Sequence, residues 1–220
     1  IKTKLAGGGS GTDDVKEARI LNRIVRRTDA GWEYEADQRH ADLIVKETGA
    51  DRASILSHPG GDKKVIEEEE KSEELQGAEA TRFRAVAARA NYLADGRPDI
   101  QYAVKEVCRK MAKPVKGDWQ KLVRLGRYLK GAPGCVLEYT WQSRCESPTG
   151  FSDSDWVGDR KTGKSTSGGL TMMGNHLVKA WSRTQDAVTL SSAEAELVAL
   201  GKLAMEVLGV RSMATEWHMM

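Results

Sequence analysis

Long apolar runs are missing from this chain of 220 residues. No stretch approaches the ~20 apolar residues that a membrane-spanning helix needs, and no signal-peptide pattern is present. Cysteine is also scarce, since Cys108, Cys135 and Cys145 are an odd number at wide spacing and form no Cys-x-x-Cys pair. The sequence therefore argues against a disulfide framework and a zinc knuckle, and it favours a reducing compartment.

Histidine and net charge identify no partner either. The four histidines have no neighbour at the spacing of metal ligands, so we interpret each as an ordinary surface or core residue. The formal net charge of +2 is too small to indicate a ligand by itself. With 40% hydrophobic and 30% charged residues, the composition is typical of a mostly globular chain with one large or two small domains.

Short alternating segments come first along the chain. Residues 18–27 and 32–37 alternate in polarity and are separated by the turn "TDAG", which predicts one β-hairpin. Residues 38–48 are predicted to form a helix that stops at Gly49. The pattern then weakens, and the glutamate-rich run at 67–74 is interpreted as a solvated linker.

Helical spacing dominates the middle of the chain. Apolar residues predict helices over 83–94, 100–111 and 116–131, with Pro98 in the first turn of the second and Pro114 beyond its end. The third helix has an apolar side opposite a basic side. The basic residues are Lys116, Lys121, Arg124 and Arg127. They fit a solvated surface and a contact with a phosphate backbone about equally well.

The C-terminal third predicts strands and then one long helix. A strand over 134–141 precedes an antiparallel meander over 150–185. The helix is predicted to start near Ser191 and to run towards Trp217. Ser191 and Glu194 have the spacing of a capping box, with Leu190 and Ala195 placed for a hydrophobic staple.

Three carboxylates need a separate explanation. Asp153 and Asp155 lie on one face of a predicted strand, and Asp155 is nearer the turn, where an aspartate is expected for hydrogen bonding alone. Glu196 shares helical spacing with Leu200 and Leu203, where a carboxylate is costly unless a cation or hydrogen bonds compensate it. A strand aspartate facing a helix glutamate would supply half of a Mg²⁺ or Mn²⁺ site. The alternative is a glutamate at the margin of the stripe that reaches water.

Four motifs carry a family resemblance. The motifs are Ser-Asp-x-Asp-Trp at 152–156, "KSTSGG", "AWSRTQ" and "LSSAEAE". Their order and spacing resemble those of the ribonuclease H domain of copia-type LTR retrotransposon Pol polyproteins. Upstream, "YLADGRPDIQYAVKEVCRKMAKP" and "RLGRYLKG" resemble the stretch between reverse transcriptase and ribonuclease H. "GWEYEADQRHADLIVKETG" is similar to the end of the reverse transcriptase. The resemblance extends over nearly the whole chain and is weakest over 50–77.

The resemblance implies a mixed α+β fold. A helical region like a polymerase thumb or connection would precede a truncated ribonuclease H-like fold, made of a three-stranded antiparallel meander and a long helix. The implied divisions are the end of the reverse transcriptase (1–76), a helical connection (77–140) and the N-terminal part of the ribonuclease H domain (150–220). The "GTDDV" at 11–15 is interpreted as a loop, because the Tyr-x-Asp-Asp strand of the polymerase is not found.

The resemblance also implies an activity. Asp153 and Glu196 match catalytic, metal-ligating carboxylates of a nuclease that cuts RNA in RNA–DNA hybrids with two Mg²⁺ (or Mn²⁺) ions. The basic residues Lys116, Lys121, Arg124 and Arg127 would contact nucleic acid. The implied partners are the hybrid and the rest of the Pol polyprotein, and neither a membrane nor a small-molecule substrate. The implied location is a cytoplasmic virus-like particle, with the nucleus as an alternative.

Two further aspartates are implied by the resemblance at positions beyond Met220. We therefore expect a fragment that is inactive alone. A non-catalytic nucleic-acid-binding remnant or domesticated module is the alternative, and a scaffold without any nucleic-acid role is a third hypothesis.

Overall fold

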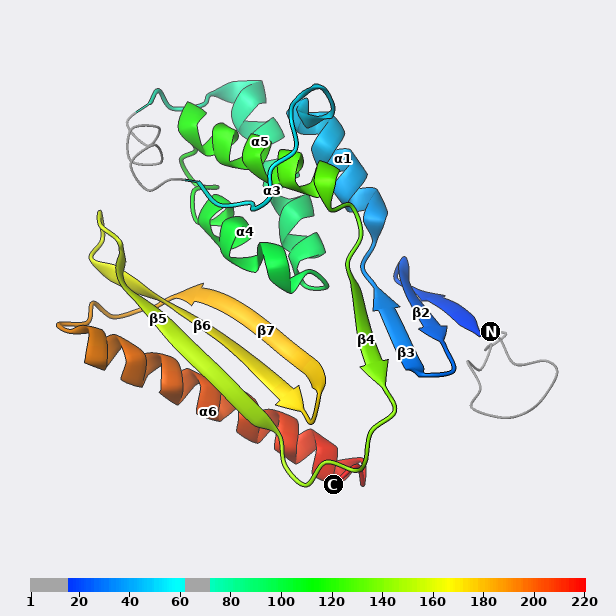
Figure 1. Ribbon diagram of the computed structural model, residues 1–220. Helices are drawn as coiled ribbons and strands as arrows, with labels where there is room; N and C mark the ends of the chain where they lie inside the picture. The colour runs from blue at the N-terminus through cyan, green and yellow to red at the C-terminus, as the bar shows by residue number, and fades with distance from the viewer. Residues whose placement is uncertain (1–15, 62–71) are drawn as a thin grey trace. The chain divides into compact units, whose positions relative to one another are not determined.

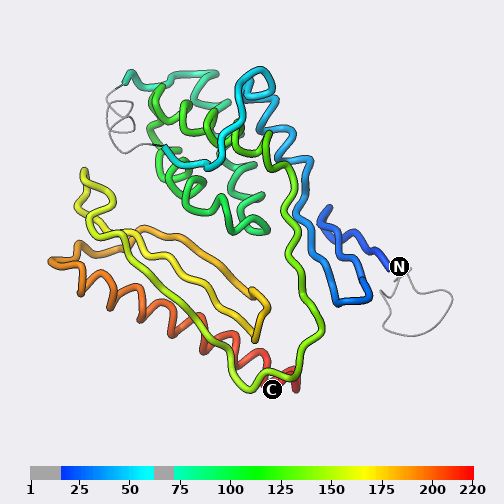
Figure 2. Tube along the Cα trace, viewed as in Figure 1, coloured from blue at the N-terminus to red at the C-terminus, as the bar shows by residue number. Residues whose placement is uncertain are grey.

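The computed structural model describes residues 16–61 and 72–220, which fall into two compact units (Figures 1 and 2). Within these residues, the first unit contains the chain up to Arg27 and Glu33–Val136, and the second contains Thr28–Trp32 and Leu137–Met220. Five α-helices and two antiparallel sheets in the described ranges confirm the predicted mixed α+β class. None of these helices has the length and apolar character needed to cross a bilayer. The predicted loop at 11–15 and most of the glutamate-rich run at 67–74 lie outside the described residues.

The first strands contain one more turn than predicted. The strands are β1 (Glu17–Ile20), β2 (Arg23–Arg27), β3 (Gly31–Glu35) and β4 (Val136–Thr140), in the sheet order β1-β2-β3-β4. The prediction of a single strand over 18–27 is wrong, because the chain reverses at Leu21 and Asn22, whose φ angles are 50° and 62°. Positive φ at both central residues defines a type I′ turn. Its sequence lacks the glycine that usually marks such a turn.

The helices of the first unit surround one hydrophobic core, as their apolar spacing predicts. They are α1 (Gln38–Thr48), α3 (Gly77–Ala94), α4 (Gln101–Cys108) and α5 (Lys116–Gly131), with 3-10 turns at Ala50–Arg52 and Pro98–Ile100. Phe83, Leu122 and Leu125 are fully buried at the centre of the core. Helix α1 stops at Gly49, which has a φ of 71°, so the predicted end of this helix is confirmed.

The second unit contains the predicted meander and long helix. Strands β5 (Thr149–Asp159), β6 (Lys164–Met173) and β7 (His176–Thr184) pair in the order β5-β6-β7, and α6 (Ser192–Glu216) lies along one face of this sheet (Figure 1). The serine- and glycine-rich motif "KSTSGG" has the composition of a hairpin turn between strands, but it does not form one. These residues begin β6, and the turn precedes them at 160–163, where Gly163 has a φ of 68°.

Strand β5 contains an irregularity just after its regular part. Its register with β6 shifts between Asp155 and Asp159, and Val157 takes a φ of 52°. That conformation costs a β-branched residue about 1–2 kcal/mol. The Val157 N–H donates to Ser165 Oγ at 3.1 Å, and the Ser165 hydroxyl is also 2.9 Å from the Thr189 hydroxyl. Buried hydroxyls therefore hold the strained residue and end the regular pairing next to Asp155.

Candidate functional site

Asp153 lies in the regular part of β5, at the edge of the three-stranded sheet. A Cβ built on Gly150 would approach Leu203 Cδ1 of α6 to 2.7 Å, so Gly150 faces the helix. Because side chains alternate along a strand, Ser154 faces the helix as well, whereas Asp153 and Asp155 share the opposite face. Asp153 is exposed to solvent.

Glu196 lies in the second turn of α6 and is exposed. The buried residues of the helix are Ala195, Ala199, Leu203, Val210 and Ala214. The prediction that Glu196 belongs to the apolar stripe is therefore wrong, because the stripe runs one position earlier along the helix. Leu200, which shares its spacing, is 54% exposed. Glu196 is a carboxylate at the margin of the packed face, as the alternative interpretation had it.

The Glu196 side chain nevertheless reaches β5. Its Oε1 accepts a hydrogen bond from the backbone N–H of Ser154 at 3.1 Å. Edge strands present N–H groups that face no neighbouring strand, and the carboxylate takes one of them. Since Ser154 directly follows Asp153, this bond brings the two predicted metal ligands to the same stretch of the β5 edge.

The start of α6 leaves Glu196 free of a capping role. Ser191 Oγ accepts from the Glu194 N–H at 3.1 Å, so the predicted N-cap is confirmed. The Glu194 carboxylate accepts from the Leu190 N–H at 2.7 Å. In a standard capping box it would accept from the N–H of the N-cap residue, Ser191, which is one residue later. The predicted hydrophobic staple is wrong, because Leu190 is 88% exposed while Ala195 is buried.

The donors at the β5 edge suit a hydrated divalent cation. Asp153 and Glu196 supply carboxylate oxygens, which Mg²⁺ and Mn²⁺ prefer, and Mg²⁺ commonly binds through one or two carboxylates while keeping several waters. Across residues 16–61 and 72–220, no group of three or more His, Cys, Asp or Glu side chains is placed to hold a metal ion. The two carboxylates therefore have the donor chemistry of part of a metal site, and Asp153 leaves β5 on the face opposite to α6, which carries Glu196.

The basic residues of α5 do not share one solvent-facing side. Lys121 is only 8% exposed, and its Nζ lies 3.0 Å from Oδ1 of the buried Asp118. The interpretation of Lys121 as a surface cation is wrong, because Asp118 one turn earlier holds its ammonium group within the protein. Lys116 is exposed and pairs with Glu73 at 2.5 Å.

The C-terminal half of α5 uses its cations to hold the segment at 50–61. Arg127 donates from Nε to Ser54 O at 2.8 Å and from Nη2 to Ser54 Oγ at 2.6 Å. Lys130 Nζ donates to two backbone carbonyls of the same segment, at 2.8 and 2.9 Å. A Cβ on Gly61 would lie 3.1 Å from Arg124 Nη1. The basic side of the helix thus anchors the weakly patterned segment, a role that charge spacing alone did not reveal.

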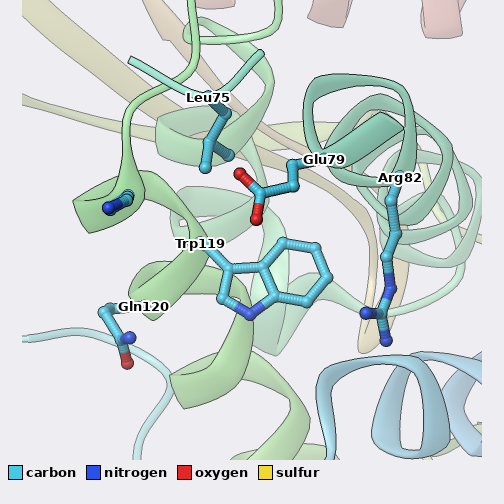
Figure 3. A pocket seen from close by; sticks show the side chains of 6 residues that line it. Leu75, Glu79, Arg82, Trp119 and Gln120 are labelled. Atoms are coloured by element: carbon cyan, nitrogen blue, oxygen red, sulfur yellow. The ribbon is translucent and has the colours of Figure 1, made fainter. Parts of the chain in front are cut away.

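A pocket of about 280 Å³ opens in the first unit next to Trp119 (Figure 3). Its lining residues are Leu75, Glu79, Arg82, Lys116, Trp119 and Gln120. The Arg82 guanidinium lies 5.0 Å from the indole centroid and 3.5 Å from the Glu47 carboxylate. Lys116 pairs with Glu73. Both cations are balanced by acidic partners, so the charges around the pocket do not select a ligand.

Comparisons with known proteins identify relatives of the chain. The retrovirus-related Pol polyproteins from transposons RE2 and RE1 of Arabidopsis thaliana are each 34% identical to it, over 138 and 136 residues, which is 62% of the chain in both cases. The chain spans only 9% of the length of each polyprotein. Secreted RxLR effector protein 161 of Plasmopara viticola is 36% identical over 122 residues, 54% of this chain and 85% of the effector. No protein-family profile and no solved structure matches the chain.

Proposed function

Because the chain belongs to the family of retrovirus-related Pol polyproteins from copia-type transposons, we propose that it is the part of such a polyprotein where reverse transcriptase gives way to ribonuclease H. The proposed activity of the intact polyprotein is Mg²⁺-dependent hydrolysis of RNA in RNA–DNA hybrids during reverse transcription. The observation that carries this proposal is the hydrogen bond from the Ser154 N–H to Glu196 Oε1, next to Asp153.

Each carboxylate has a distinct part in the proposed site. Asp153 extends from an edge strand into solvent, where a nucleic-acid backbone has access to it. Glu196 is held against the same edge by the Ser154 N–H. Metal ions bound there would activate water and stabilise the leaving oxygen of the phosphodiester. Asp155 is on the same face as Asp153, but it lies where the register of β5 with β6 shifts, and we do not assign it to the metal.

Hybrid binding tests the proposed partner. We expect residues 1–220 to bind a labelled RNA–DNA hybrid with an affinity that falls steeply between 50 and 200 mM salt, because phosphate contacts release counterions. Lys116→Gln should weaken binding and lower the salt slope by about one unit, because the exposed Lys116 can exchange its weak surface pair with Glu73 for a phosphate contact. Lys46→Gln, which removes an exposed charge from α1, is the matched control and should change neither. Fluorescence anisotropy measures both quantities, and binding that does not depend on salt would contradict the proposal.

Cleavage is examined on the same hybrid. We expect residues 1–220 alone to give no detectable product with Mg²⁺ or Mn²⁺, since two carboxylates are only part of a metal site. Robust cleavage that Asp153→Asn abolishes would show that this chain alone suffices for catalysis and would overturn that expectation.

A non-catalytic module is the second candidate function. The relative named a secreted effector supports it, because the chain covers 85% of that protein. The shared region therefore makes up most of at least one other protein. Hybrid binding that is unchanged by Asp153→Asn and unaffected by divalent cations would favour this candidate.

A further inference from the structure

Gln185 is a buried polar residue that directly follows β7. It is 5% exposed, and its Nε2 donates to Ser167 Oγ at 2.8 Å and to Ala195 O at 2.9 Å. Its backbone N–H donates to Ser165 O at 2.8 Å. One side chain therefore connects β6 to the beginning of α6. The amide oxygen Oε1 is buried without a hydrogen-bond partner among the described residues, so the side chain is held by the two bonds of Nε2, which would be costly to leave unmade.

The bonds of Gln185 form a closed path with Glu196. Ala195, which accepts from Gln185, directly precedes Glu196 in α6. Ser167, the other acceptor, pairs in register with Ser154 of β5. Ser154 in turn donates its N–H to Glu196 Oε1. Gln185 supplies the hydrogen bonds of this path on the buried side of the sheet, and Glu196 accepts the hydrogen bond at its open edge.

Apolar packing near the start of α6 is slight. The buried residues in its first two turns are Ala195 and Ala199, whose small side chains remove little apolar area from water. The larger neighbours Leu190 and Leu197 are 88% and 68% exposed. Specific hydrogen bonds therefore have more influence on the location of this end of the helix than side-chain packing does.

We propose that Gln185 is the positioning residue for Glu196. It fixes the first turns of α6 against β6 so that the Glu196 carboxylate meets the β5 edge beside Asp153. The position of Glu196 follows from the hydrogen bonds within the second unit. That this position serves metal binding rests on the proposed function. Gln185 contacts neither Asp153 nor the proposed metal, and it acts through the helix.

Amide hydrogen exchange at Ser154 tests the proposal in the full chain without added metal. Gln185→Met keeps the length of the side chain and removes its hydrogen bonds. We expect it to accelerate exchange of the Ser154 amide by about tenfold or more, towards the rate in Glu196→Ala, because the bond to the carboxylate is lost. Ser167→Ala removes one of the two bonds of Gln185, folds with less disturbance, and should give a smaller acceleration.

Ser165→Ala is the matched control. Ser165 is a fully buried serine of the same strand whose hydroxyl bonds Val157 and Thr189 instead. It should lower global stability but leave Ser154 exchange unchanged after correction for global unfolding. The proposal is overturned if Gln185→Met changes Ser154 exchange no more than Ser165→Ala does. If Ser154 exchange responds to Gln185 but the chain binds no divalent cation, the positioning role stands and the proposed function fails.

Discussion

Replacing Arg97 with methionine is expected to destabilise the helical unit by about 3 kcal/mol, at the lower end of the cost of breaking a buried ion pair. Arg97 is 1% exposed. It donates from Nε to Asp99 Oδ1 at 2.9 Å and from Nη2 to Asp99 Oδ2 at 2.8 Å. It also donates to the carbonyls of Ala132 and Pro133 at 2.9 and 3.2 Å. The substitution leaves two carbonyls without the Arg97 donor, and it leaves the Asp99 carboxylate with its hydrogen bond from the Tyr128 hydroxyl at 2.8 Å.

Urea denaturation of the variant measures this cost. Arg39→Met is the matched control, because Arg39 also pairs with an aspartate, Asp37, at 2.9 Å but is 63% exposed. Asp37 is buried but keeps its hydrogen bond from the Arg39 backbone N–H in this variant, so losing the exposed guanidinium should cost about 1 kcal/mol or less. A loss of stability in Arg97→Met no larger than in Arg39→Met would contradict the assignment of Arg97 as a buried anchor.

The effect of Arg97→Met should also depend on pH. Burial raises the pKa of Asp99, but the hydrogen bonds from Arg97 and Tyr128 outweigh burial and hold this pKa below its usual value. A carboxyl group whose pKa is lower in the folded state stabilises the fold above its unfolded pKa, and this contribution is lost as pH falls through the folded pKa. The difference between wild type and variant should therefore be full at neutral pH and shrink below about pH 4.

Replacing Trp181 with alanine is expected to cost the second unit about 3–5 kcal/mol. Trp181 is 7% exposed and lies opposite Gly169 in the register of β6 and β7. A Cβ on Gly169 would lie 2.5 Å from Trp181 Cζ2, so the ring occupies the space over the glycine. Gly169→Ala should accordingly cost about 1–3 kcal/mol by overpacking.

A double-mutant cycle tests this packing. Trp181→Leu removes the ring atoms that a Cβ on Gly169 would meet, so Gly169→Ala should cost less in the Trp181→Leu background than in wild type. Trp217→Ala is the control, because Trp217 is 65% exposed and its loss should change stability by no more than about 0.5 kcal/mol. Strictly additive effects of the two substitutions would contradict the contact.

Local signals in the sequence predicted much of the fold. Gly49 ends α1 and Ser191 begins α6 because the residues that stop and cap helices act within one turn of the chain. Apolar spacing predicted α3, α4 and α5, whose buried faces form the core. The turn at Leu21 and Asn22 was missed because neither residue is a glycine.

Features that depend on tertiary contacts could not be predicted from spacing. Lys121 has the spacing of a basic surface, but the buried Asp118 one turn away draws it inwards. Glu196 reaches β5 through a hydrogen bond, its place relative to the apolar stripe was predicted one position off, and its role as a metal ligand stays a prediction. The role of Gln185 had no signal in the sequence, since its partners are brought to it by strand register and by the packing of α6.

Titration of the ¹⁵N-labelled chain with Mn²⁺ tests the central claim most directly, because a paramagnetic ion broadens the amide signals nearest to it. We predict that the first signals to broaden are those of Asp153, Ser154 and Glu196, and that Asp153→Asn and Glu196→Gln each weaken this effect. Asp155→Asn, a carboxylate change two residues away on the same face, should leave it in place. Broadening that starts elsewhere, such as at the glutamate-rich run at 67–74, or that is unchanged in Asp153→Asn, would contradict a metal site at the β5 edge.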